Sequence, residues 1–284
     1  MMHTRVLPRR SLLRAAALPT SLVITVWLAT ACANKSSPNK SGSARPVDDL
    51  KARVLRTLAH DRNAFTQGLV YHEGKLYEST GLVGRSSLRR VDLDTGRVEQ
   101  SVPVEAPFFG EGLARVGGEL VQLTWQNGKA FVWNMSGLNK LKEFDYQGEG
   151  WGLCHDGKRL VMSDGSDKLT FRDAGNFAVT GSVNVTRGGQ PVRHLNELEC
   201  VDKVVYANIW GSDNIARIDP ATGEVTGWID AGGLLSRTEI MGTDVLNGIA
   251  HMPDKNTFLI TGKLWPRLFE VEFIPAGSLP AERP

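Results

Sequence analysis

The sequence predicts an all-β protein folded as a five-bladed β-propeller. Helical periodicity is almost absent after residue 50, where short β-patterned runs alternate with turn residues. A Gly-Leu type of motif also recurs five times, at intervals of 40 to 51 residues. A repeat of roughly 40–50 residues in β-rich sequence is typical of propeller blades. The five copies are Thr66-Gln67-Gly68-Leu69, Gly110-Glu111-Gly112-Leu113, Gly150-Trp151-Gly152-Leu153, Leu195-Asn196-Glu197-Leu198 and Leu246-Asn247-Gly248-Ile249.

A second β-patterned run follows each copy, which predicts an antiparallel partner for each innermost strand. Third and fourth strands follow in turn, such as Leu88–Leu93 and Val98–Val104. The last repeat ends after its third strand, near Leu268–Phe273. We therefore expect Val54–Leu58, which precedes the first repeat, to supply the missing outer strand of the last blade. This closes the ring and leaves no exposed edge.

The N-terminus has the features of an export signal. Arg9 and Arg10 open a twin-arginine-like segment, and a mainly apolar stretch from Ala15 to Ala31 leads to Cys32. Leu28-Ala29-Thr30-Ala31-Cys32 resembles a lipoprotein cleavage site with Cys32 as the lipidated residue. The same residues also contain an Ala-x-Ala site, so a plain secretory signal is the alternative. We assign 1–32 to the signal, 33–50 to a flexible linker and 51–284 to the propeller.

Charge and cysteine content set limits on partners and redox state. Without the signal the chain carries 29 basic and 31 acidic residues, a balance that indicates no nucleic-acid partner. We expect an extracytoplasmic monomer that contacts the membrane only through a lipid anchor. Cys154 and Cys200 are one residue out of register between repeats, so alternation points their side chains to opposite sheet faces. We therefore expect two separately buried thiols rather than a disulfide.

The repeat brings one position of each blade together around a common axis. Those positions hold Gln67, Glu111, Trp151, Asn196 and Asn247, and Glu111 is their only acid. The end of each second strand returns beside the start of the first, because the two are antiparallel. The same mouth should therefore also receive the residues Trp125, Trp210 and Lys263.

These residues lie within motifs that resemble the glutaminyl-peptide cyclotransferases of the plant and bacterial type, also called glutamine cyclotransferases. The resemblance covers about Val54 to Phe273. Among its motifs are Phe65-Thr66-Gln67-Gly68-Leu69, Phe109-Gly110-Glu111-Gly112, Glu149-Gly150-Trp151-Gly152-Leu153, Leu195-Asn196-Glu197-Leu198-Glu199 and Thr261-Gly262-Lys263-Leu264-Trp265. It implies a five-bladed propeller that converts an N-terminal glutamine of peptides or proteins into pyroglutamate, with release of ammonia. Cys154 and Cys200 depart from the family pattern.

The chemistry of cyclisation fits one buried carboxylate. The α-amine attacks the side-chain amide of the same residue, so proximity comes largely from the folded substrate. One group must take a proton from the amine and give one to the leaving nitrogen, and a carboxylate can do both. We expect Glu111 to be this catalytic group, its pKa raised by apolar neighbours. A carboxylate that only caps a turn between two glycines is the alternative.

The remaining candidate residues bind substrate. Gln67, Asn196 and Lys263 can hydrogen-bond the amide oxygen, the α-amine or the main chain, although buried amides also commonly satisfy neighbouring backbone groups. Five aromatic residues would form the walls that hold the aliphatic part of glutamine, with ordinary core packing as the alternative. These are Phe65, Phe109, Trp125, Trp151 and Trp210.

No cofactor is expected. The histidines are scattered without paired ligand spacing, which argues against a catalytic zinc. The run Ser163-Asp164-Gly165-Ser166-Asp167 could hold a structural calcium, although a tight turn is the favoured interpretation. Two other functions remain open. A propeller that binds peptide N-termini or another small polar ligand needs no acid in an aromatic pocket, whereas a lactone hydrolase needs several oxygen ligands in the inner column.

Overall fold

The structure, a computed structural model, describes residues 46–278. All regular elements within this range are strands, so the prediction of an all-β fold is confirmed. None of the described segments is a helix long and apolar enough to cross a membrane. The expected export signal, with Cys32, and the linker up to residue 45 lie outside the described residues. Strand β1 begins at Asp48, so the last three residues assigned to the linker belong to the sheet.

Three four-stranded antiparallel sheets follow one another along the chain. The first contains β2 (Thr66–His72), β3 (Lys75–Thr80), β4 (Ser87–Asp92) and β5 (Val98–Pro103). The second contains β6 (Gly110–Val116), β7 (Glu119–Thr124), β8 (Lys129–Asn134) and β9 (Lys140–Asp145). The third contains β10 (Leu153–His155), β11 (Leu160–Met162), β12 (Lys168–Arg172) and β13 (Val179–Asn184). Strands pair in chain order, as the repeat predicts.

An eight-stranded sheet contains the rest of the repeat and both ends of the described chain. Its order is β16 (Leu195–Val201), β17 (Val204–Ile209), β18 (Asn214–Ile218), β19 (Val225–Asp230), β1 (Asp48–Ala59), β22 (Arg267–Pro275), β21 (Thr257–Gly262) and β20 (Leu246–Met252). β1 pairs antiparallel with β22 from Leu50 to Ala59, and parallel with β19 over Asp48–Lys51. The expected pairing of the N-terminal strand with the last repeat is therefore present. A small hairpin, β14 (Thr186–Arg187) and β15 (Gln190–Pro191), precedes β16.

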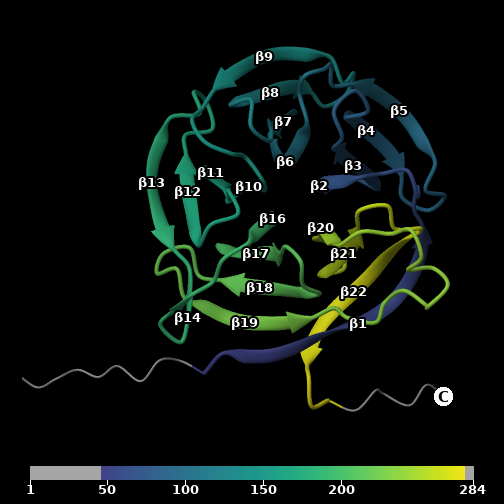
Figure 1. Cartoon of the computed structure of the whole chain (residues 1–284), viewed down its shortest axis with the longest axis vertical. Helices are drawn as coiled ribbons and strands as arrows, with labels where there is room; N and C mark the ends of the chain where they lie inside the picture. Colours follow the sequence, from purple (N-terminus) through teal and green to yellow (C-terminus); the bar gives the residue numbers. More distant parts are fainter. Residues whose placement is uncertain (1–45, 279–284) are drawn as a thin grey trace, which may run out of the picture. The chain divides into compact units, whose positions relative to one another are not determined.

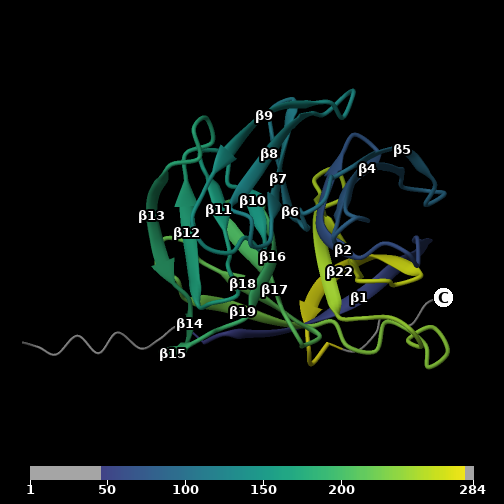
Figure 2. The ribbon, with the colours of Figure 1, turned by 45° about the horizontal axis from the view of Figure 1, so that its top comes forward.

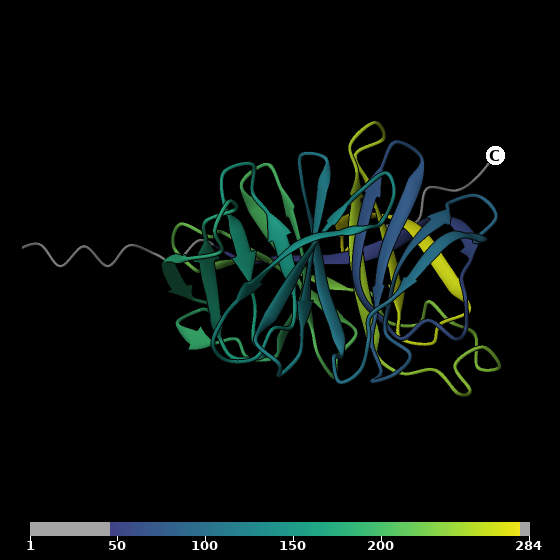
Figure 3. The same cartoon turned by 90° about the horizontal axis from the view of Figure 1, so that it is seen from above.

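The sheets surround a common centre, with β2, β6, β10, β16 and β20 innermost (Figure 1). In Figure 2, β6, β10 and β16 can be followed side by side, and Figure 3 shows the connecting loops gathered at the two ends of the strands. Buried apolar side chains fill the spaces between neighbouring sheets in five clusters. The core is therefore divided between the sheets and leaves polar side chains at the centre.

The glycines of the repeated motif allow the inner strands to approach closely. A Cβ on Gly112 would lie 2.6 Å from the backbone nitrogen of Leu153. A Cβ on Gly152 would fall on the carbonyl oxygen of Asn196, in the next sheet. A side chain at either position would force the strands apart. Glycine follows the site residue in these repeats because neighbouring strand starts need that space.

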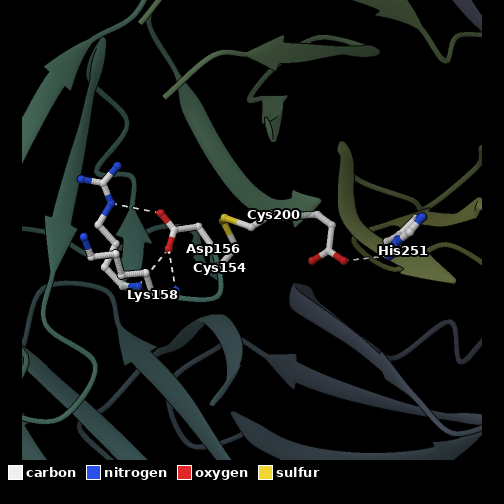
Figure 4. The surroundings of a disulfide bond; sticks show 7 residues. Cys154, Asp156, Lys158, Cys200 and His251 are labelled. Carbon is white, nitrogen blue, oxygen red and sulfur yellow. Dashed lines mark hydrogen bonds and ion pairs between the residues drawn. A yellow bond between two sulfur atoms is a disulfide. The ribbon is translucent and has the colours of Figure 1, made fainter. Parts of the chain in front are cut away.

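The expectation for the two cysteines is wrong, because Cys154 and Cys200 form a disulfide with a Cα–Cα distance of 5.4 Å (Figure 4). The two side chains do belong to opposite faces of their sheets, as the register predicts. However, the sheets stack around the centre so that the front face of one sheet packs against the back face of the next. Both sulfurs therefore enter the same apolar layer between β10–β13 and β16–β19.

Candidate active site

All nine residues predicted for the pocket line one cavity of about 370 Å³, which is within the size range of small-molecule sites. They are Phe65, Gln67, Phe109, Glu111, Trp125, Trp151, Asn196, Trp210 and Lys263. Asn247, the fifth member of the inner column, is buried next to Gln67. The structure therefore brings the predicted set together, at the end of the molecule where the inner strands begin.

Strand direction explains how distant residues meet at this mouth. Gln67, Glu111 and Asn196 are the second residues of the inner strands β2, β6 and β16. Trp125 and Trp210 immediately follow the second strands β7 and β17. Because each first and second strand pair is antiparallel, the start of one lies beside the end of the other. The pairs β6–β7 and β16–β17 thereby each contribute residues to the same cavity from both strands.

Glu111 is the buried acid of the cavity, with 5% of its surface exposed. Burial raises its pKa well above the usual range, the nearby Lys263 ammonium opposes that rise, and the Glu149 carboxylate adds to it. The aromatic rings around it provide the low-polarity surroundings that disfavour its charged form. The raised pKa makes the ionised form of this carboxyl group a stronger base than an exposed glutamate.

An amide chain orients one oxygen of Glu111. The Nδ2 of Asn247 donates to Gln67 Oε1 at 3.3 Å, and the Nε2 of Gln67 donates to Glu111 Oε1 at 2.8 Å. Gln67 therefore donates a hydrogen bond to Glu111, whereas the sequence predicted a direct hydrogen bond between Gln67 and the substrate. The other carboxyl oxygen, Oε2, has no hydrogen bond to any described residue. Gln67 thus fixes the acid with one oxygen available to the cavity.

Asn196 and Lys263 provide donors on the same cavity. The Nδ2 of Asn196 is buried and lacks a hydrogen-bond partner among the described residues. A buried amide N–H without a partner is costly and indicates a ligand position. Lys263 is only 6% exposed, and its Nζ lies 4.9 Å from the centre of the Phe65 ring. Burial lowers the pKa of Lys263, while the Glu111 carboxylate opposes that effect.

Aromatic rings form the walls of the cavity. The Phe109 ring lies 6.1 Å from Phe65 and 5.7 Å from Trp125 in edge-on arrangements, and Trp151 lies 6.1 Å from Trp210. Trp125 is 37% exposed and Trp210 46% exposed, so these two rings border the opening. Edge-on aromatic pairs hold each other in place and present flat apolar faces to a ligand.

Glu149 is a site residue that the sequence analysis did not single out. Its Oε2 accepts hydrogen bonds from the indole nitrogens of Trp125, at 2.8 Å, and Trp151, at 2.9 Å. The only sequence signal is its position two residues before Trp151, within a motif already noted. The contact with Trp125, which belongs to another loop, could not be inferred from that spacing.

The segment considered for calcium folds as a tight turn. Asp164 Oδ1 accepts hydrogen bonds from the backbone nitrogen and the hydroxyl of Ser166. Ser163 Oγ donates to the carbonyl of Asn196 at 2.6 Å and thereby links β11 to the start of β16. Across residues 46–278, no three His, Cys, Asp or Glu side chains gather in a way that could hold a metal ion.

Comparison with known proteins gives consistent matches. The family model described as glutamine cyclotransferase matches residues 23–273. A glutaminyl-peptide cyclotransferase from Arabidopsis thaliana is 44% identical over 230 residues, which is 79% of this chain and 72% of the relative. The crystal structure of Myxococcus xanthus glutaminyl cyclase superposes with a TM-score of 0.73 at 43% identity, covering 80% of this chain and 98% of that one.

Proposed function

The chain belongs to the glutamine cyclotransferase family and is a glutaminyl-peptide cyclotransferase, and we propose that Glu111 carries out its chemistry by shuttling a proton without a catalytic metal. Its substrates are peptides or proteins that begin with glutamine, and its products are pyroglutamate and ammonia. The single observation that carries the mechanism is the position of Glu111. It is the buried acid of a cavity lined by all nine predicted residues.

The reaction proceeds through one tetrahedral intermediate. The neutral α-amine attacks the side-chain carbonyl carbon, and the ionised Glu111 takes a proton from the attacking nitrogen. The bond between the carbonyl carbon and the amide nitrogen then breaks, and Glu111 returns the proton so that the nitrogen leaves as ammonia. Gln67 holds one oxygen of Glu111, so the other is left to serve both transfers. The raised pKa supports the first transfer, because the anion of a weaker acid is a stronger base.

Asn196 and Lys263 stabilise the negative charge that develops on the amide oxygen. The unpartnered Nδ2 of Asn196 is a preformed donor, and Lys263 adds positive charge in a water-poor cavity. A single well-aimed donor of this kind is worth about 3 kcal/mol in the transition state. The aromatic walls hold the methylene groups of the substrate glutamine and exclude water that would compete for these donors.

For the fold, we propose five blades of four strands. The eight-stranded sheet counts as two blades joined through β1, which pairs with both β19 and β22. The fourth blade is then β16–β19, and the last contains β20, β21, β22 and the N-terminal strand β1. This count agrees with the five copies of the repeated motif.

We also propose an extracytoplasmic location for the enzyme, which acts there as a monomer. Residues 1–32 would direct export, Cys32 would carry the lipid, and the residues before β1 would tether the catalytic domain. The Cys154–Cys200 disulfide supports this location, because structural disulfides persist in oxidising compartments. We propose no nucleic-acid partner, no cofactor and no structural calcium.

The test is ammonia release from a Gln-initiated peptide, followed by mass spectrometry with and without a chelator. The wild-type protein should convert the peptide in both conditions, and Glu111→Gln should not. Loss of conversion with the chelator alone would contradict the metal-independent mechanism. Conversion by Glu111→Gln at the wild-type rate would contradict the role of Glu111. A folded wild-type protein that binds the peptide without converting it would favour the binding-module alternative.

A further inference from the structure

The carboxylate of Glu149 forms hydrogen bonds with two of the tryptophans that line the cavity. Trp125 follows β7, whereas Trp151 precedes β10, so the two indoles come from different sheets. Both indole nitrogens donate to the same oxygen of Glu149, Oε2, at 2.8 and 2.9 Å. Its other oxygen accepts a hydrogen bond from Gln126 Nε2 at 2.9 Å. Both oxygens of this carboxylate therefore accept hydrogen bonds from side chains of the protein.

The two tryptophans are also bonded to the strand that carries the catalytic acid. The backbone nitrogen of Trp125 donates to the carbonyl of Phe109 at 3.0 Å, and the nitrogen of Gly112 donates to the carbonyl of Trp151 at 2.8 Å. Phe109 and Gly112 flank the start of β6, where Glu111 lies. Together with these two backbone hydrogen bonds, the Glu149 carboxylate links Trp125, the start of β6 and Trp151 in a closed set of contacts.

The residues around the Glu149 carboxylate are closely packed. Gly150 donates its backbone N–H to the carbonyl of Trp125 at 2.9 Å, and a Cβ at Gly150 would clash with the hydroxyl of Tyr146. On the far side, a Cβ at Gly165 would lie 2.7 Å from the Trp151 ring. Glycine is required at both positions, so the surroundings of Trp151 are close-packed.

Chemistry explains why a carboxylate is needed here. An indole N–H can only donate, and it needs an acceptor when it is turned away from solvent. An ionised oxygen can accept from two donors at once, and such charge-assisted bonds are stronger than neutral ones. The Trp151 indole and the other donors hold the pKa of Glu149 below its usual range. The resulting negative charge favours the protonated form of Glu111.

We propose that Glu149 is a positioning residue for the cyclisation. Its hydrogen bonds hold the rings of Trp125 and Trp151 against the substrate, and its negative charge acts on Glu111. The proposal rests on the proposed role of Glu111. A local role, in which Glu149 only orders its own loop, would need the contact with Trp151 but not the one with Trp125. The two variants Glu149→Leu and Glu149→Gln separate geometry from charge.

Glu149→Leu removes both acceptors at similar size. We expect kcat/KM to fall by about tenfold to hundredfold, the range for losing hydrogen bonds to a charged group, with KM raised as the walls loosen. Acrylamide should quench the tryptophan fluorescence more strongly than in the wild type. Gln126→Ala is the matched control within the cluster, because it removes only the outer partner of the carboxylate. Glu143→Gln, on the exposed strand β9, controls for loss of a surface charge.

Glu149→Gln keeps an acceptor oxygen and removes the charge. We expect normal quenching and a KM near the wild-type value, but the acidic limb of the kcat/KM profile should move to lower pH as the pKa of Glu111 falls. Glu143→Gln should leave that limb in place.

Two results would overturn the proposal. One is a folded Glu149→Leu protein with wild-type KM, kcat and quenching. The other, decisive if Glu149→Leu does not fold, is a Glu149→Gln protein whose pH profile matches the wild type. A wild-type protein that releases no ammonia would instead refute the proposed mechanism, and the quenching measurements would still report on the clamp.

Discussion

Removing the Cys154–Cys200 disulfide should strongly destabilise the catalytic domain. The bond joins β10 to β16, and the two cysteines are 46 residues apart in the chain. In the chain-entropy model, opening a loop of that length returns about 13 cal/mol/K to the unfolded chain, or about 4 kcal/mol at 25 °C. Domains are commonly stable by only about 5–15 kcal/mol, so this is a large share of the total.

Urea unfolding followed by tryptophan fluorescence measures this loss. We would compare the oxidised wild type, the same protein with reductant, and the Cys154→Ser/Cys200→Ser double variant. The midpoint should fall in the second and third samples, and the dependence on urea should steepen because the unlinked chain exposes more surface. Reductant should have no effect on the double variant, which controls for other actions of the reagent.

The catalytic site should survive this change under native conditions. Ser163 Oγ accepts from the nitrogen of Gly152 at 2.8 Å and donates to the carbonyl of Asn196, so β10 and β16 are also joined beside the cavity. We therefore expect near-normal kcat/KM without urea. Oxidised and reduced wild-type proteins that unfold at the same urea midpoint would contradict this prediction, as would a thiol titration that finds two free cysteines in the native protein.

Three further changes test the site and its support. Asn196→Ala should lower kcat by about a hundredfold, the effect of losing one preformed oxyanion donor, yet leave the urea midpoint nearly unchanged because Nδ2 has no protein partner to lose. Gly152→Ala should cost about 3 kcal/mol or more in urea unfolding, since its Cβ would fall on a backbone oxygen, whereas Gly118→Ala, which meets nothing, should not. Burial lowers the pKa of His60, but the Glu78 carboxylate raises it by more, so the net shift is upward. The stabilising effect of His60 should therefore be complete below about pH 6.5 and decline as pH rises through its folded-state pKa. The difference in unfolding free energy between the wild type and His60→Gln should therefore shrink with pH, and a difference that grows would refute this sign.

The sequence predicts most of the site because the repeat encodes it. Inner-strand residues occupy equivalent places, so their convergence follows from the period alone, and antiparallel pairing adds the residues after the second strands. Contacts between repeats are harder to infer. The repeat predicts the register of Cys154 and Cys200, but not that opposite faces of neighbouring sheets pack together and bring the two sulfurs into one layer. Likewise, spacing within one loop cannot reveal that Glu149 contacts Trp125 in the loop between β7 and β8.

The exception within the repeat shows how the centre is completed. Four copies of the motif place glycine after the site residue, and the fourth copy places Glu197 there. This side chain is fully buried, and its two oxygens accept the backbone N–H groups of Leu69, at 3.2 Å, and Ile249, at 2.8 Å. Those amides belong to β2, in another sheet, and to β20, at the opposite edge of the eight-stranded sheet that contains β16. A glycine at position 197 would leave both N–H groups buried without partners, at about 1–3 kcal/mol each. The glycines of the repeat therefore leave space where the inner strands converge, and Glu197, which replaces glycine in one copy, accepts hydrogen bonds from two backbone N–H groups there.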